Sequence, residues 1–387
     1  MTKLRQTLCK IAFVTMATAA FAATPGTASA TNAKTLVVGT MWEALPLAMQ
    51  PRRSRFFNES EILDTLVKLD YDLKPVAGLA TSWDRLSPTV WQFNLRENVV
   101  FHDGAKLDAD AVKFSIERVI ALLPYAADLL NIKQMTVKAP LVLEIETTEP
   151  FAALPNQLSD AITGIYAKSS FNDAGEFVTP VGTGPWKLTE YSKQDHTTVS
   201  RFDGYWGKKP ALETIEYRYI PDHNSRTLAL EAGEVDFVDN LLPSDVIRLS
   251  RDDNFKVYSK PTAGLYYGAF NAGEKSPLSD VRVRKAINAL VDRNLIVEGA
   301  LDGTGKPAWQ FFGPQFDWAP KVTNPYKLDL ELAASLLTEA GYEKTDGKWQ
   351  KNGEPLTLRI LSYSSRTEMP MITEAMAALL NQNGIAT

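Results

Sequence analysis

The amino-acid sequence predicts an α/β protein built from two or three domains. Its 387 residues, 45% of them hydrophobic and 22% charged, exceed what a single hydrophobic core usually organises. A strand-like stretch at 213–220, a helical stretch at 226–232 and a second strand-like stretch at 234–239 follow one another directly. Gly233 stands where a helix would end in a left-handed residue. This strand, helix and strand succession indicates a sheet that is at least partly parallel.

The first predicted strand, at 35–40, leads into a long loop that is a candidate binding segment. The loop at 41–58 mixes aromatic residues, Trp42 and Phe56 among them, with three arginines. Loops at the carboxyl ends of strands are where open α/β sheets bind ligands. We therefore expect Trp42 and Phe56 to contact a ligand, although the same side chains would also suit a hydrophobic core. A helix is predicted over 59–69.

The segment 79–118 joins an alternating strand, a turn and a capped helix. Apolar and polar residues alternate over 90–96, the period-two pattern of a strand with one buried face. His102 lies in the turn that follows, and Asp108 then caps a predicted helix. The apolar positions of this helix are Val112, Phe114, Ile116 and Val119. A strand of the type found at sheet edges is predicted over 138–147.

A glycine-containing stretch opens the next group of predicted strands. Gly182 and Gly184 are expected where the backbone needs a positive φ or a close approach to other atoms. The pattern then predicts strands over 187–191 and 197–202, with a turn over 202–210 before the strand and helix described first.

Eight short motifs stand along the chain in a fixed order. They read WQFNLR at 91–96, FHDG at 101–104, ADAV at 109–112, VGTGPW at 181–186, YWGKKP at 205–210, LEAGEVD at 230–236, SDVRVRKAIN at 279–288 and LLTEAGY at 336–342. Each motif alone is a weak signal, but together they make chance similarity negligible. The chain resembles the family 5 extracellular solute-binding proteins, the peptide and nickel class that feeds ABC importers, from about residue 36 to its last residue.

The resemblance implies the type II periplasmic binding protein fold, with two lobes and an inserted α+β domain. Lobe I is expected at 31–64 and 180–262, the inserted domain at 65–179 and lobe II at 263–387. Because members of the family continue beyond the position of Thr387, the chain looks truncated at its carboxyl end and lobe II is expected to be incomplete.

The first 30 residues have the pattern of a cleavable signal peptide. Three basic residues precede an apolar run of 13 residues at 11–23, too short for a membrane span of roughly 20, and small residues precede a cleavage site after Ala30. Cleavage after Ala22 is the alternative. Cys9, the only cysteine, lies in this leader, so the mature protein is expected to carry no disulfide and no cysteine ligand. The predicted location is the periplasm.

The charge of the mature chain argues against nucleic acid as a partner. Removing the three basic leader residues leaves 38 basic against 46 acidic side chains, a net charge of −8. Nucleic acids and anionic membrane surfaces select basic faces, which this composition does not favour. We expect a soluble monomer.

Candidate ligand contacts lie mainly in the expected second lobe. Tyr266, Tyr267 and Asn271 occur where the chain crosses between lobes in the family, and Trp309 begins an aromatic loop. Arg366 precedes a predicted helix, whose amino end favours an anion, and its guanidinium suits bidentate binding of a carboxylate. Aromatic residues in these positions would also be consistent with core packing.

Neither catalysis nor a bare metal site is indicated. The histidines are His102, His196 and His223, and no motif surrounds them with a nucleophile or further ligands. Nickel-binding relatives often place an arginine for a chelator in the segment corresponding to 154–165, where this chain has none. No catalytic residue, resident metal or cofactor is predicted.

The resemblance implies a periplasmic component of an ABC importer, which traps a solute between two lobes and presents it to a permease in the inner membrane. A di- or oligopeptide or a similar small organic solute is the expected ligand. A nickel or metal-chelate binder of the same family is the first alternative, and a secreted hydrolase is the second.

Overall fold

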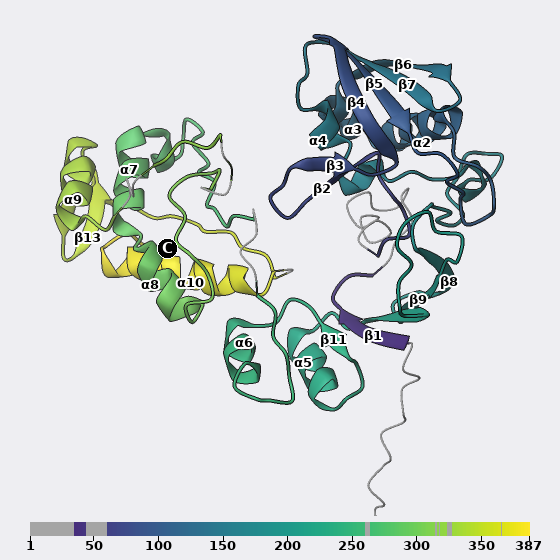
Figure 1. Cartoon of the computed structure of the whole chain (residues 1–387). Helices are drawn as coiled ribbons and strands as arrows, with labels where there is room; N and C mark the ends of the chain where they lie inside the picture. The colour runs from purple at the N-terminus through teal and green to yellow at the C-terminus, as the bar shows by residue number, and fades with distance from the viewer. Residues whose placement is uncertain are drawn as a thin grey trace, which may run out of the picture.

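The structure is a computed structural model that describes residues 35–43, 60–259, 264–313, 316, 318–322, 327–364 and 366–387. The expected leader, 1–30, and Phe56 lie outside the described residues. Two bodies are visible in Figure 1: one contains β1 to β11 and the other contains helices α7 to α10. Helices α5 (His223–Glu231) and α6 (Pro243–Leu249) lie between them in this view.

The first body is organised around a five-stranded mixed sheet in the order β11-β1-β10-β9-β8. Strand β1 pairs in parallel with both β10 and β11, whereas β9 and β8 continue the sheet in antiparallel fashion. Helix α5 connects β10 to β11 and is followed by Gly233 at a φ of 73°. The predicted partly parallel sheet is therefore confirmed. The strands are β1 (Thr35–Thr40), β8 (Trp186–Ser192), β9 (His196–Arg201), β10 (Thr214–Tyr219) and β11 (Phe237–Val238).

A four-stranded antiparallel sheet in the order β4-β5-β7-β6 lies above the mixed sheet in Figure 1. Trp91, Phe93 and Leu95 are buried on one face of β5, as the alternation predicts. The expectation of an edge strand over 138–147 is wrong, because a tight turn at Pro140 divides this segment and leaves β7 in the sheet interior. The strands are β4 (Ala80–Ser87), β5 (Val90–Leu95), β6 (Ile132–Ala139) and β7 (Val142–Thr147).

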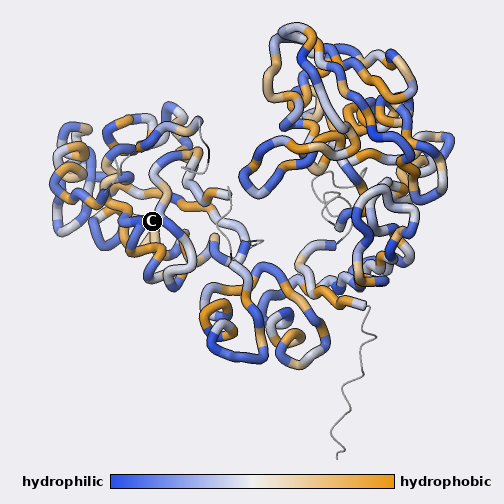
Figure 2. Tube along the Cα trace, in the orientation of Figure 1, coloured by the Kyte–Doolittle hydropathy of each residue, from blue (hydrophilic) through white to orange (hydrophobic). Residues whose placement is uncertain are grey.

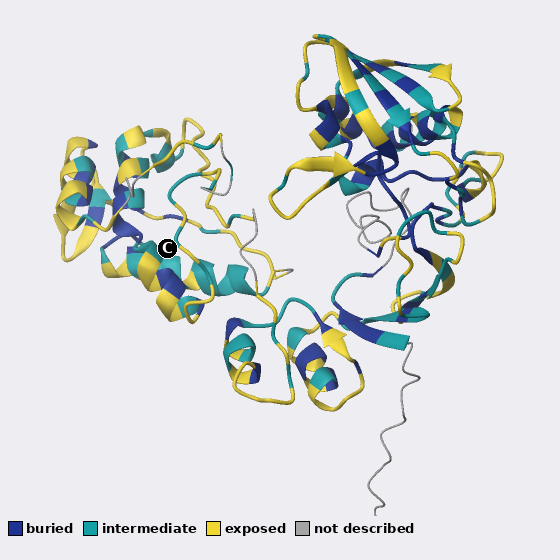
Figure 3. Cartoon of the chain, viewed as in Figure 1, coloured by how far each residue is buried: buried dark blue, intermediate teal, exposed yellow. Residues whose placement is uncertain are grey.

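Helix α2 (Ala109–Leu122) joins the two sheets into one body. Asp108 accepts a hydrogen bond from the Ala111 N–H at 2.8 Å, which confirms the predicted cap. Val112 and Ile116 face the core of the four-stranded sheet, whereas Val119 packs with residues of the mixed sheet. Buried residues accordingly line the inner sides of the helix and sheets in Figure 3. The short helices α3 (Pro124–Leu130) and α4 (Leu154–Gln157) complete the layer.

The predicted helix over 59–69 is wrong in the described residues. A buried connection at 60–66 leads instead to a hairpin of β2 (Val67–Leu69) and β3 (Pro75–Ala77). The backbone carbonyls of Glu61 and Ile62 accept hydrogen bonds from Trp186 and Gly184 rather than from a helical turn. Every residue of this segment except Glu61 is buried, and its apolar side chains join the cores of both sheets. A sequence pattern cannot distinguish such a buried connection from a buried helix.

Hydrogen bonds of His102 link its turn to the segment 182–184. The backbone N–H of His102 donates to the Gly182 carbonyl at 2.9 Å, and the Gly182 N–H donates to Nδ1 at 3.3 Å. Because Nδ1 accepts, the neutral ring carries its proton on Nε2, which lies 3.0 Å from the Gly184 carbonyl oxygen. His102 is therefore a structural clamp and not a free base.

We expect the stabilising contribution of His102 to weaken as the pH falls. Burial lowers the pKa of His102 below its ordinary value of 6.5, so the unfolded chain takes up a proton at a higher pH than the folded chain. The contribution is complete above the unfolded pKa and is lost as the pH falls through the folded pKa. Urea unfolding of the native chain and of His102→Ala should show a larger loss of unfolding free energy at pH 8 than at pH 5. Equal losses at the two pH values would contradict this assignment.

The second body packs four helices against a small sheet. Its core residues include Val283, Ile287, Leu290, Leu337, Trp349, Leu358, Leu380 and Ile385. In Figure 2, orange apolar segments alternate with blue polar ones along the chain of this body. The elements are α7 (Val281–Leu290), α8 (Arg293–Ala300), α9 (Leu330–Glu339), β12 (Glu343–Thr345), β13 (Lys348–Lys351), β14 (Glu354–Pro355) and α10 (Glu368–Gln382). None of the described helices is both long and apolar enough for a membrane span.

The division into lobe I, an inserted domain and lobe II remains a prediction. It agrees in outline with the separate sheets, because the mixed sheet takes β1 and β8 to β11 while the antiparallel sheet uses only residues 80–147. The terms lobe I, inserted domain and lobe II denote these predicted parts of the chain.

Candidate functional site

The carboxyl edge of the parallel strands forms the first wall of the candidate site. Trp42 and Glu43 follow the end of β1, and Tyr219 ends the neighbouring strand β10. Since β1 runs parallel to β10 and β11, their carboxyl ends meet at one edge of the sheet. Ligands of open α/β sheets bind at this edge. The structure therefore puts Trp42 in the position that the sequence predicts for a binding residue.

Glu43 is a buried carboxylate at this edge. Only 8% of the residue is exposed. Its Oε1 atom accepts hydrogen bonds from the Tyr191 hydroxyl at 3.1 Å and from the Gln194 backbone N–H at 2.7 Å, so it holds the turn between β8 and β9. Burial, followed by the nearby Glu43 carboxylate, raises the pKa of Tyr191 above its ordinary value. Glu43, Tyr191 and Tyr219 are not among the ligand contacts predicted from the sequence.

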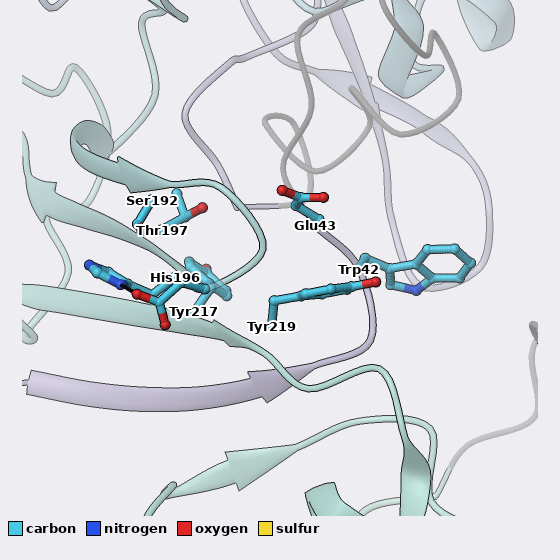
Figure 4. Close-up of a pocket in the computed structure, with 8 residues that line it drawn as sticks. Trp42, Glu43, Ser192, His196, Thr197, Tyr217 and Tyr219 are labelled. Carbon is cyan, nitrogen blue, oxygen red and sulfur yellow. Dashed lines mark hydrogen bonds and ion pairs between the residues drawn. The ribbon is translucent and has the colours of Figure 1, made fainter.

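A small cavity adjoins this carboxylate. Its volume is about 10 Å³, which is about the space that one water molecule occupies. Figure 4 shows Glu43, Tyr219 and His196 around it, on the loop after β1 and on the adjacent strands. Its lining residues are Trp42, Glu43, Ser192, Asp195, His196, Thr197, Tyr217 and Tyr219.

His196 is engaged by acids at both ring nitrogens. Nδ1 lies 3.0 Å from the Asp195 carboxylate, and Nε2 lies 3.4 Å from that of Glu190. The hydrogen bond to Asp195 is the main cause that raises the pKa of His196 above 6.5. This first wall is acidic, because Glu43, Glu190 and Asp195 outnumber its single imidazole.

Lobe II supplies the second group of candidate residues. The Tyr266 hydroxyl lies 2.9 Å from the Glu368 carboxylate at the start of α10. Burial, and then the Glu368 charge, raise the pKa of Tyr266 to about 12. Arg366 is close enough to act on Tyr266 electrostatically, and within the described residues its exposed guanidinium donates no hydrogen bond. The structure thus brings two of the predicted residues, Tyr266 and Arg366, together.

Tyr267 belongs to an aromatic cluster on lobe II. Its ring lies 5.4 Å from that of Phe311 in an edge-to-face arrangement, and the contacts continue from ring to ring. The cluster consists of Tyr267, Phe311, Phe312, Phe316 and Trp318. Tyr267 is 63% exposed and Trp318 is 65% exposed, so the cluster presents large apolar rings to solvent.

The remaining predicted residues have separate surroundings. Asn271 is exposed, and its Oδ1 accepts the Gly273 N–H at 3.3 Å. The Trp309 ring lies below the guanidinium of Arg293, with 5.6 Å between the cation and the ring centroid. Phe56 lies outside the described residues. No interaction in the described parts links Asn271 or Trp309 to Tyr266.

Metal ligation is poorly supplied by this arrangement. Over the described ranges, no group of three or more His, Cys, Asp or Glu side chains is placed to hold a metal ion. His102 uses both nitrogens in backbone contacts, and His196 uses both in contacts with acids. The groups that these walls do offer are hydrogen-bonding groups, charges and aromatic rings.

An α/β body with its parallel strand ends at one edge, next to a second body carrying aromatic and charged residues, defines a protein of the two-lobed solute-binding class. Comparison with known proteins agrees with this class, because the family described as "Bacterial extracellular solute-binding proteins, family 5 Middle" matches residues 74–387. The chain belongs to this family of solute-binding proteins.

Individual relatives differ in the solutes that their names state. The chain is 29% identical to the nickel-binding periplasmic protein of Escherichia coli over 86% of its own length and 66% of that protein. It is also 29% identical to the glutathione-binding protein GsiB of Salmonella paratyphi A over 78% of its length and 60% of the relative. It therefore spans slightly less than two thirds of each of these proteins.

A solved structure shows the same fold. The crystal structure of NikA from Brucella suis in complex with Fe(III)-EDTA aligns with a TM-score of 0.80 at 30% identity. The alignment covers 91% of this chain and 74% of that one. The predicted fold class, the type II periplasmic binding protein fold, is thus confirmed.

Proposed function

We propose that this protein is the periplasmic solute-binding component of an ABC importer and that it holds its solute between the two lobes. The observation that carries this proposal is the family match over 74–387, combined with a binding edge at the end of the parallel strands. The relatives named for nickel and for glutathione support the same general role. The partner would be a permease in the inner membrane.

Binding in such a protein needs no covalent chemistry. The solute contacts residues of both lobes only when the lobes approach, so it favours the closed form by its extra affinity for that form. Trp42 and Glu43 would supply one wall, and Tyr266, Tyr267 and Arg366 the other. Arg366 would bind a carboxylate of the solute, because its planar guanidinium donates two parallel hydrogen bonds.

An organic solute, such as a di- or oligopeptide, is the preferred ligand. The exposed rings of the aromatic cluster offer apolar contact area, and Arg366 offers an exposed guanidinium that donates no hydrogen bond to the described residues. A metal chelate is the second candidate, because relatives at 29% and 30% identity are named for nickel or crystallised with an iron chelate. Against it stands the absence of an arginine at 154–165.

The protein is further proposed to act without enzymatic activity, as a monomer and without nucleic acid. In the described residues, no serine, threonine or cysteine side chain hydrogen-bonds to a histidine ring, and the rings of His102 and His196 are engaged by backbone groups and by acids. The acidic net charge disfavours a nucleic-acid partner. Export by the predicted leader would bring the chain to the periplasm.

The test is ligand-induced stabilisation of the secreted chain. We expect its melting temperature to rise with at least one member of a panel of di- and oligopeptides and glutathione, because a ligand that binds only the folded state stabilises it. Nickel with histidine tests the second candidate in the same assay. If no organic solute or chelate raises the melting temperature or binds in calorimetry, solute binding by this chain is contradicted.

A further inference from the structure

We propose that Glu43 is a specificity-determining residue that binds a primary ammonium group of the solute. The inference rests on the proposed solute-binding function and defines its ligand class more narrowly. The ligand would be an amine-bearing organic solute, such as a peptide with a free amino terminus or a solute with an aminoalkyl group. Its ammonium group would enter the small cavity beside Glu43.

Glu43 is a largely buried carboxylate for which the described residues supply no counter-ion. The residue is 92% buried, and both of its hydrogen bonds go to one oxygen, Oε1. In the described part of the chain, no lysine or arginine forms an ion pair with it, and Oε2 receives no hydrogen bond. Because Oε2 accepts no hydrogen bond from the described residues and is not fully enclosed, a cation can reach it, and a largely buried carboxylate is costly unless it is paired.

The volume of the cavity favours an ammonium group over a larger cation. Its volume of about 10 Å³ suits one water molecule or a group of similar size. An ammonium group has this size, whereas a planar guanidinium is considerably larger. A primary amine is thus the cation that fits beside Glu43.

The other residues that line the cavity also favour a cation. Trp42, Tyr217 and Tyr219 line the cavity, and aromatic faces attract cations. Asp195 adds a second carboxylate. The imidazole on the lining, that of His196, is already flanked by Asp195 and Glu190 and does not contact Glu43.

Glu43 also holds the turn between β8 and β9, and the experiment must separate this role from recognition. The substitution Glu43→Gln keeps a carbonyl oxygen that can accept from Tyr191 and Gln194, but it removes the charge. A purely structural role therefore predicts that Glu43→Gln binds solutes as the native chain does. Recognition of an ammonium predicts a loss confined to amine-bearing solutes.

The test measures binding of matched pairs of solutes by calorimetry to the native chain, Glu43→Gln and Glu97→Gln. The pairs are tri-alanine and tri-leucine, each with a free and an acetylated amino terminus. We expect acetylation to weaken binding to the native chain about tenfold to a hundredfold, the range for a hydrogen bond to a charged group. Glu43→Gln should lose a similar factor for the free amines and nothing for the acetylated forms. Glu97→Gln removes the same charge at an exposed position after β5, outside the cavity lining, and should change affinity by less than about threefold.

The outcomes distinguish this inference from the proposed function. If an acetylated solute binds as tightly as its free amine, or if Glu43→Gln leaves the affinity for the amine unchanged, the inference is overturned while solute binding stands. If no solute of any class binds to the native chain, the proposed function fails and the inference falls with it. The comparison of free and acetylated solutes uses the native chain, so it decides the question even if Glu43→Gln does not fold.

Discussion

The substitution Gly184→Ala is expected to lower the unfolding free energy by about 3 kcal/mol or more. A Cβ atom at this position would lie 2.0 Å from the backbone oxygen of Glu61 and 2.8 Å from its carbonyl carbon. These are backbone atoms of the buried connection at 60–66, so they cannot move aside as a flexible side chain would. Gly182 has the same relation to the Ile62 oxygen, at 2.1 Å. The two glycines are required for close approach.

Urea unfolding of the secreted chain measures this effect. Gly268→Ala is the matched control, because a Cβ there would meet no atom within 4 Å and the backbone is not left-handed. Its unfolding free energy should stay within about 0.5 kcal/mol of the native value. Equal stability of Gly184→Ala and Gly268→Ala would show that the contact between 182–184 and 60–66 is not as tight as described.

The substitution Arg226→Met is expected to cost about 3 to 5 kcal/mol of stability. Arg226 is 1% exposed, and its guanidinium donates to the carbonyls of Ile220, Pro221 and Asn240 at 2.7, 2.9 and 3.2 Å. These carbonyls follow β10 and β11, so Arg226 ties together the carboxyl ends of the strands on either side of β1. Removing it leaves three acceptors unsatisfied and takes away the positive charge beside the partly buried Asp239.

Arg248→Met serves as the control for Arg226→Met. Arg248 lies on α6 and contacts two carboxylates, those of Glu231 and Asp245, but its side chain is 51% exposed. Solvent screens such pairs, so this variant should unfold almost as the native chain does. If Arg248→Met proved as destabilising as Arg226→Met, surface ion pairs and not buried carbonyl contacts would dominate this part of the fold.

Elements with local signals could be predicted from the sequence. The alternation over 90–96 defines β5, Asp108 marks the start of α2, and Gly233 marks the end of α5. In each case the physical cause lies within a few neighbouring residues, namely a period, a side-chain cap or a left-handed glycine. Such causes are visible without a structure.

Elements determined by distant contacts could not be predicted in this way. The connection at 60–66 is buried because distant segments enclose it, and its backbone partners at Gly184 and Trp186 stand more than 100 positions away in the sequence. The strand β7 appeared to be an edge strand because Pro140 precedes it. The structure gives that proline to a turn, and β6 takes the edge.

The candidate site was predictable only where a local signal marks its residues. The rule that ligands bind at strand ends selects Trp42 from the position of β1. Glu43 follows it directly, but a glutamate in a loop gives no sign of burial. Its partners Tyr191 and Gln194 lie 148 and 151 positions later, so only the folded chain shows the carboxylate as buried. Phe316 and Trp318 were likewise apparent only through their ring contacts.

A solute is proposed to draw the two lobes together, and the distance between labels on the two sides tests this proposal most directly. Cys9 is the only cysteine and lies in the predicted leader, so spin labels can be attached to the secreted chain at Asp173→Cys and Glu354→Cys alone. Both positions are exposed, one in the inserted domain and one in lobe II. Pulsed electron paramagnetic resonance should show a shorter distance when a solute found by calorimetry is present at saturation. An unchanged distance distribution at saturation would contradict binding between the lobes.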